Sequence, residues 1–261
     1  MGNLLSTCGW SQNVYISSGK NTLTNGLKEA KKIFESAACK VTIHLEAGIY
    51  EEDSKRIGLF GKSGILIDFP VTIIGAGPNK TFVEGSLLLL ISDLFHNVNG
   101  NATYECNHVT IKDLTVRKSD SHGLFVKKLY FTCINVNFTE CSGCGVKNVS
   151  GHGKLIDCEI TKCGGSGIVS PSQRRGLTEV SGRRSKVTEN CTEGKSDDFG
   201  LQTLGGDLII HPPLTKESIS TDNGGGGNWG GKNSDIYIGS REEIVLNEKK
   251  MTNGGSVTPS Y

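Results

Sequence analysis

Apolar and polar residues alternate along the middle of the chain, and the alternation recurs every 22 residues. Segments 134–146 and 156–168 align at this offset without a gap, and a third copy begins at Leu114. An apolar period of two indicates β-strands with one buried face. Since a parallel strand pair needs a crossover of a dozen residues or more, a unit this short cannot hold strand, helix and strand. We therefore expect each unit to be one coil of a solenoid.

The repeat arranges equivalent residues in columns that cross successive coils. A glycine followed by an apolar residue keeps the period strictly, which indicates a turn with positive φ or a close backbone approach. The pairs are Gly123-Leu124, Gly145-Val146 and Gly167-Ile168. Regular coils are predicted from about residue 109 to 170, with irregular coils after 175. Gly167 and Gly200 are 33 residues apart, so we expect a loop inserted in the basic stretch 174–184.

The segment before the coils begins with an amphipathic pattern over residues 22–38. It predicts a helix with Thr22 as its N-cap. The residues expected on its buried face are Leu23, Leu27, Ala30, Phe34 and Ala37. Strands are expected at 41–45 and 71–77, with a turn at 47–51 between them. The domain organisation expected is a flexible segment 1–20, a single β-helix domain 21–240, and a C-terminal cap or tail 241–261.

These coils resemble the degenerate repeats of the pectin-lyase-like superfold, in its carbohydrate-binding and sugar-hydrolase class. The helix, the strand ending in Gly48-x-Tyr50 and the strand ending in Gly75-x-Gly77 resemble the opening of pectin methylesterases. Residues 213–231 resemble a tail seen in β-helix proteins of large DNA viruses and protists. The resemblance covers about residues 20–205. It implies an all-β, right-handed parallel β-helix with about 22 residues per coil and an N-terminal capping helix, but no particular activity.

Bulk properties narrow the function classes. The net charge of +1 gives no electrostatic reason to bind nucleic acid. No apolar run is long enough to span a membrane, and no classical secretion signal is recognised. The nine cysteines then favour a reducing compartment. We expect a cytoplasmic or membrane-associated protein, or a virion component if the source is viral.

The N-terminal residues fit an acylation pattern. Gly2 with Ser6 matches N-myristoylation, and Cys8 is a candidate for palmitoylation. Two chains would anchor the protein stably, whereas one gives marginal binding. The alternative is an unmodified terminus. Membrane contact is expected only through this acylation.

Two polar columns form the candidate ligand site. The residues are Asp113, Asn135 and Asp157 in one column, Thr115, Asn137 and Glu159 in the next, and Arg117 one step further. Oxygen ligands grouped in this way suit Ca²⁺ or sugar hydroxyls. The alternative is a solvated sheet face. Apart from calcium on this face, no cofactor is expected.

Other motifs have simpler interpretations. Cys141-x-x-Cys144 suggests zinc, but the repeat places Cys158 inward and Cys141 and Cys163 at a small-residue turn position, so we favour packing. The Gly-His-Gly motif around His152 occurs without the aspartates and basic residues that accompany it in polygalacturonases.

Two functional hypotheses remain. The first is a non-catalytic β-helix that acts as a structural or glycan-recognition module, with proteins or glycans as partners and the oligomeric state left open. The alternative is a polysaccharide-active enzyme (lyase, hydrolase or epimerase) with a diverged site around Asp113, Asp157 and Glu159. The first is favoured because the superfold's catalytic residue sets are missing. Whether the protein is an enzyme stays open.

Overall fold

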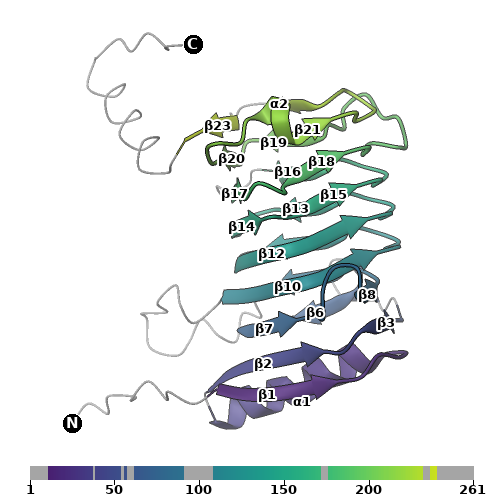
Figure 1. The fold of residues 1–261 in the computed structure, drawn as a ribbon, viewed down its shortest axis with the longest axis vertical. Coiled ribbons are helices and arrows are strands. Elements are labelled where there is room, and N and C mark those ends of the chain that lie inside the picture. Colours follow the sequence, from purple (N-terminus) through teal and green to yellow (C-terminus); the bar gives the residue numbers. More distant parts are fainter. Residues whose placement is uncertain are drawn as a thin grey trace, which may run out of the picture.

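The chain folds into parallel strands that stack along one axis in two sheets, a solenoid-like arrangement (Figure 1). The structure is a computed structural model. It describes residues 11–37, 39–53, 56–57, 62–90, 108–171, 176–231 and 236–239. Among these residues there are two helices, and the only antiparallel strand pairing outside isolated bridges is one short hairpin.

The first sheet has a main row and a side row of strands. The main row comprises β1 (Ser11–Ile16), β2 (Lys40–Leu45), β7 (Val71–Ile74), β10 (His108–Arg117), β12 (Tyr130–Thr139), β14 (His152–Ile156), β17 (Leu177–Ser181), β20 (Asp207–Ile210) and β23 (Ile236–Ile238). The side row contains the second halves of β10 and β12 together with β3 (Gly48–Glu51), β8 (Thr81–Glu84), β15 (Glu159–Thr161), β18 (Lys186–Thr188) and β21 (Ser220–Thr221).

The second sheet closes each coil from the other side. It comprises β6 (Ile65–Ile67), β9 (Leu87–Leu90), β11 (Leu124–Lys127), β13 (Val146–Asn148), β16 (Ile168–Pro171), β19 (Leu201–Leu204) and β22 (Trp229–Gly231). The remaining elements are the hairpin β4 (Arg56–Ile57) and β5 (Lys62–Ser63) and the helices α1 (Thr22–Ala37) and α2 (Lys216–Ile219).

A single left-handed residue turns each regular coil from the main row into the side row. Asp113, Asn135 and Asp157 have φ of 56°, 55° and 53°, a conformation that Asp and Asn adopt more readily than most residues. Ile111 and Leu114 are both buried although they are three positions apart, an odd spacing that would place them on opposite faces of a regular strand. The corner therefore shifts the inward alternation by one residue and needs no loop.

The strand registers confirm the 22-residue period. Val109 pairs with Phe131, and Asn137 with Glu159. The period then lengthens in three places: Ile156 pairs with Ser181 at 25 residues, Glu159 with Lys186 at 27, and Ile168 with Leu201 at 33. The expectation of one insertion at 174–184 was wrong, because six of the eleven extra residues lie between β18 and β19.

Helix α1 covers the core at the lower end of the stack (Figure 1). Its residues Leu23, Leu27 and Ala30 are buried, whereas Ala37 is exposed against expectation. Its first turn is held by the carboxylate of Glu52, which accepts hydrogen bonds from the backbone N–H of Leu23 at 2.9 Å and of Thr24 at 3.2 Å. Thr22 lies inside the helix and is not its N-cap, and the expected turn at 47–51 contains strand β3.

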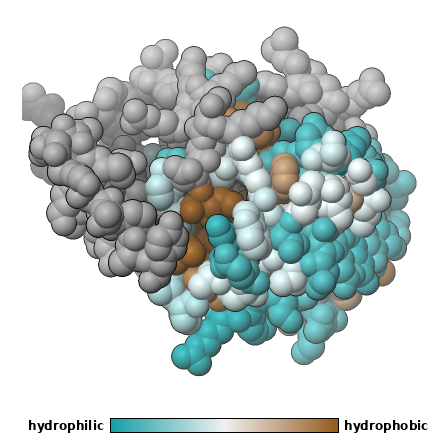
Figure 2. All heavy atoms as spheres, turned by 90° about the horizontal axis from the view of Figure 1, so that it is seen from above, coloured by the Kyte–Doolittle hydropathy of each residue, from teal (hydrophilic) through white to brown (hydrophobic). Residues whose placement is uncertain are grey.

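At the upper end the core is partly open to solvent. Ile238 continues the inward column of Ile210 but is 49% exposed, whereas Ile210 is fully buried. Figure 2 looks onto this end and shows hydrophobic atoms near its centre. The expected cap at 241–261 and the acylation residues Gly2 and Cys8 lie outside the described residues. No helix in the described ranges is long and apolar enough to cross a membrane.

Candidate functional site

The side chains of the Asp113 column accept or donate hydrogen bonds within the column or with one arginine. Asn135 Nδ2 donates to Asp113 Oδ1 at 2.5 Å, and Arg184 Nη2 donates to Asn135 Oδ1 at 2.5 Å. The backbone N–H of Arg184 donates to Asp157 Oδ1 at 3.0 Å. These side chains therefore stabilise the left-handed corners. The sequence patterns did not identify Arg184 as part of this column.

The second predicted column divides between core and surface. Thr115 is only 4% exposed, against the expectation of an outward side chain, and its Oγ1 donates to the carbonyl oxygen of Pro78 at 2.5 Å. Asn137 and Glu159 are partly exposed neighbours on the side row. The structure thus keeps two of the three oxygen-bearing side chains at the surface.

Arg117 is held in an ion pair. Its Nη2 lies 2.8 Å from Glu84 Oε1, its guanidinium lies 4.3 Å from the centre of the Phe82 ring, and Lys118 Nζ reaches the same carboxylate oxygen at 3.0 Å. Burial opposes the charged form of Glu84, but the hydrogen bonds from Lys118 and Arg117 outweigh it and lower the pKa of Glu84. Arg117 therefore has a structural partner on the neighbouring coil.

No group of three or more His, Cys, Asp or Glu side chains suited to a metal ion occurs within the described ranges. Calcium on the Asp113 and Asp157 columns stays an untested prediction. The cysteines have a packing role that the structure bears out. Cys141, Cys158 and Cys163 are each no more than 2% exposed, and burial raises the pKa of Cys158 to about 12.

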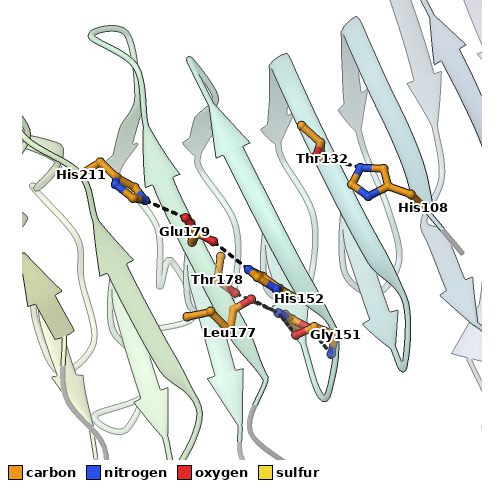
Figure 3. A network of polar contacts seen from close by, with 9 residues as sticks. His108, Thr132, Gly151, His152, Leu177, Thr178, Glu179 and His211 are labelled. Carbon is orange, nitrogen blue, oxygen red and sulfur yellow. Dashed lines mark hydrogen bonds and ion pairs between the residues drawn. The ribbon is translucent and has the colours of Figure 1, made fainter. Parts of the chain in front are cut away.

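A polar cluster that the sequence reasoning missed lies on the outward face of the main row (Figure 3). Glu179 sits between two histidines from the coils below and above it. Its Oε1 lies 2.7 Å from His152 Nε2, and its Oε2 lies 2.8 Å from His211 Nε2. The Glu179 side chain is only 9% exposed. Both carboxylate oxygens are thus engaged, each by a different imidazole.

Electrostatics fix the protonation of this cluster. Hydrogen bonding from His152 is the largest influence on Glu179; it and the bond from His211 outweigh burial and lower the pKa of Glu179 to about 2. An ionised carboxylate can only accept hydrogen bonds, so both histidines carry a proton on Nε2. The Nδ1 atoms therefore lie on the sides of the rings away from the shared carboxylate.

The Gly-His-Gly motif is explained by packing on the neighbouring coil. A Cβ at Gly153 would lie 2.0 Å from the Phe131 ring, so only glycine fits there. Gly151 donates its N–H to Asn148 Oδ1 at 2.7 Å, and Asn148 is fully buried. These contacts hold the turn that presents His152 outward (Figure 3).

Further polar and aromatic groups adjoin the cluster. His108 Nε2 lies 2.9 Å from Thr132 Oγ1, and the Tyr130 and His152 rings are tilted with centroids 5.7 Å apart. Burial, followed by the nearby charge of Lys154, lowers the pKa of His108. His108 and His152 flank Tyr130 in one column. Their separation of two full periods is a signal in the sequence that the alignment, which began at Leu114, did not cover.

We call the outward side chains of the main row the recognition face. Four of the six histidines belong to it, three by strand register and His211 directly after β20 through its contact with Glu179, together with four threonines on consecutive coils. The histidines are His44, His108, His152 and His211, and the threonines are Thr42, Thr72, Thr110 and Thr132. Scans against protein-family models and against curated proteins found no match.

Proposed function

We propose that this chain is a right-handed parallel β-helix, similar to the pectin-lyase-like superfold, that recognises glycans without cleaving them. The observation that carries the proposal is the recognition face itself. It brings hydroxyl, imidazole, phenol and ammonium groups together on a row of rigid strands. Such groups hydrogen-bond to sugar hydroxyls, and the planar rings offer apolar surfaces to sugar C–H groups.

The rigidity of the face favours binding. Its side chains stand on strands that are hydrogen-bonded on both sides from β2 to β20. Threonine is stiff at χ1, and the Glu179 cluster holds His152 and His211 in place. Little side-chain freedom is then lost when a ligand binds, which favours affinity.

The state of the acidic groups favours a non-catalytic role. Hydrolysis of a glycosidic bond uses two carboxyl groups, one of them protonated as a general acid. In the described part of the recognition face the acidic side chains are Glu179 and Asp207. With a pKa of about 2, Glu179 is ionised at neutral pH and has no proton to donate.

A second candidate is a polysaccharide-active enzyme, and one contact favours it. A carboxylate that accepts from one imidazole nitrogen fixes the tautomer and leaves the other nitrogen as a base. Glu179 does this for His152. Elimination, which needs a base to remove a proton, fits this dyad better than hydrolysis.

Binding and turnover on the same glycans separate the two candidates. We expect a glycan array to give binding that His152→Ala with His211→Ala abolishes and that Lys186→Ala, on the side row, leaves unchanged. Uronate polymers and the array ligands should stay uncut after incubation with the protein. Release of shorter products that depends on His152 would replace the binding role by the enzymatic one. An array without any bound glycan, together with no product release, would refute both.

A further inference from the structure

A cavity of about 430 Å³ lies between helix α1 and strand β6, at the lower end of the stack (Figure 1). Its volume falls within the range of about 300–1,000 Å³ that is usual for ligand pockets. One wall is the helix, which contributes Leu27 and Lys28, and the other is the strand, which contributes Ile65 and Leu66. The cavity is therefore a groove between a helix and the edge of a sheet.

Strand β6 has a free edge on the side of this groove. The first sheet continues below it to β2 and β1, but among the described strands β6 pairs only with β9 and ends the second sheet. The N–H of Ile65 donates to the carbonyl oxygen of Ser86 at 2.7 Å, on the β9 side. Because the backbone groups of successive residues in a parallel ladder point to opposite sides of the strand, the N–H and C=O of Leu66 point towards the groove.

The free edge selects a polypeptide as the ligand. A backbone N–H beside a C=O is matched by the C=O and N–H of an added strand, the mode known as β-augmentation. The groove follows α1 from Asn21 to Lys31, a length of roughly 15 Å that holds about four residues of extended chain. The helix closes the far side, so there is room for one added strand and not for an open-ended sheet.

The charged side chains that line the groove favour an acidic ligand. Asp68 pairs with Lys31 at 2.6 Å, and Asp53 pairs with Lys20 at 3.1 Å. Of the charged side chains in the described lining, Lys28 alone has no ion-pair partner. A carboxylate on the ligand compensates this charge, and such a pair adds specificity to the hydrogen bonds of the strand edge.

Apolar side chains form the floor of the groove. Leu27, Ile65 and Phe69 are each no more than 4% exposed, whereas Leu66 at the mouth is 38% exposed. Successive side chains of an extended strand point to opposite faces. An added strand with alternating aliphatic and polar residues can thus place its aliphatic side chains on the floor and its polar ones towards solvent.

We propose that the groove between α1 and β6 binds an extended peptide segment of another protein, about four residues long, which adds as a strand to the edge of β6 and places one carboxylate at Lys28. The site belongs to the second sheet and not to the recognition face, so it does not depend on glycan recognition. A fatty acid also offers a carboxylate and an apolar chain, but it leaves the N–H and C=O of Leu66 unpaired.

Fluorescence anisotropy with labelled hexapeptides tests the proposal. The probes alternate valine and threonine and carry a single glutamate, placed at each of the six positions in turn. At least one probe should bind saturably, and replacing its glutamate by glutamine should weaken binding several-fold. Two N-methylated isomers of this probe each block one edge of the peptide. One isomer should lose binding and the other should keep it, because a single edge joins β6.

Variants of the protein locate the bound peptide. Lys28→Ala should weaken binding several-fold, whereas Lys32→Ala, on the same helix but outside the groove lining, should leave it unchanged. Leu66→Pro removes the N–H that points into the groove and should abolish binding. Proline is tolerated on edge strands, and circular dichroism checks that this variant folds. If it does not fold, the two N-methylated isomers still test the strand edge.

Three results would overturn the proposal. The first is the absence of saturable binding by all six probes. The second is equal binding of the two N-methylated isomers, or equal loss of binding in Lys28→Ala and Lys32→Ala. The third is octanoate that shifts the Leu66 amide resonance while no peptide does, which would make a lipid carboxylate the occupant. His152→Ala with His211→Ala should leave peptide binding unchanged, and a loss there would contradict the separate location of this site.

Discussion

The buried carboxylate of Glu179 should make a measurable, pH-dependent contribution to stability. Its pKa is lowered from 4.5 to about 2, chiefly by the hydrogen bond from His152. Each pKa unit corresponds to about 1.4 kcal/mol, so ionised Glu179 contributes on the order of 3 kcal/mol. Because the folded-state pKa is the lower one, this stability is present above pH 4.5 and is lost as pH falls towards 2.

The perturbation that isolates this contribution is Glu179→Gln. It keeps the size of the side chain but removes the charge that holds His152 and His211. Urea unfolding of both proteins at pH 7 should show the variant less stable by about 3 kcal/mol. The comparison is repeated at pH 5, 4 and 3. The contributions of the other carboxyl groups to the free energy of unfolding cancel in the difference, because both proteins contain them.

The difference between the two proteins should stay constant from pH 7 to about 5 and shrink steadily below 4.5. Glu179→Asp, which keeps the charge but shortens the side chain, serves as a partial control. Its free energy of unfolding should lie between those of the parent protein and Glu179→Gln. A difference that persists undiminished at pH 3 would show that Glu179 stabilises the fold through packing instead of through its charge.

Three further predictions concern contacts elsewhere in the stack. Glu52→Ala should lower the free energy of unfolding by about 1–3 kcal/mol and reduce the helical signal in circular dichroism, because two N–H groups of α1 lose their acceptor; an unchanged signal would contradict this capping role. Gly153→Ala should destabilise by more than about 1 kcal/mol in thermal unfolding, because its Cβ would overlap the Phe131 ring; a melting temperature equal to that of the parent would show that the ring moves aside. Calcium should raise the melting temperature if the corner columns bind it, and Asp157→Ala should remove that rise; a calcium-independent melting temperature in the parent protein would exclude the site.

The coil period and the inward columns could be predicted from sequence because both depend on local alternation. Leu114 and Cys158 were assigned to the core and are buried there. The corners were not predicted, since a polar residue on an outward strand face and a polar residue at a left-handed turn look alike in a binary pattern. Asp113 is of the second kind, with φ of 56°.

The recognition face could be read from the sequence only in part. Its regular portion follows the 22-residue period, so Tyr130 and His152 could have been aligned with His108. Glu179 and His211 could not, because the period changes to 25 residues between β14 and β17 and again beyond them. The cluster depends on a register that the insertions in the later coils determine.

The most direct test of glycan recognition on this face is the imidazole NMR spectrum of the protein titrated with the glycan that binds it best. We expect the resonances of His108, His152 and His211 to shift with increasing ligand, while that of His122, outside the recognition face, keeps its position. Shifts confined to His122, or saturable binding that leaves His108, His152 and His211 unchanged, would contradict glycan recognition on this face.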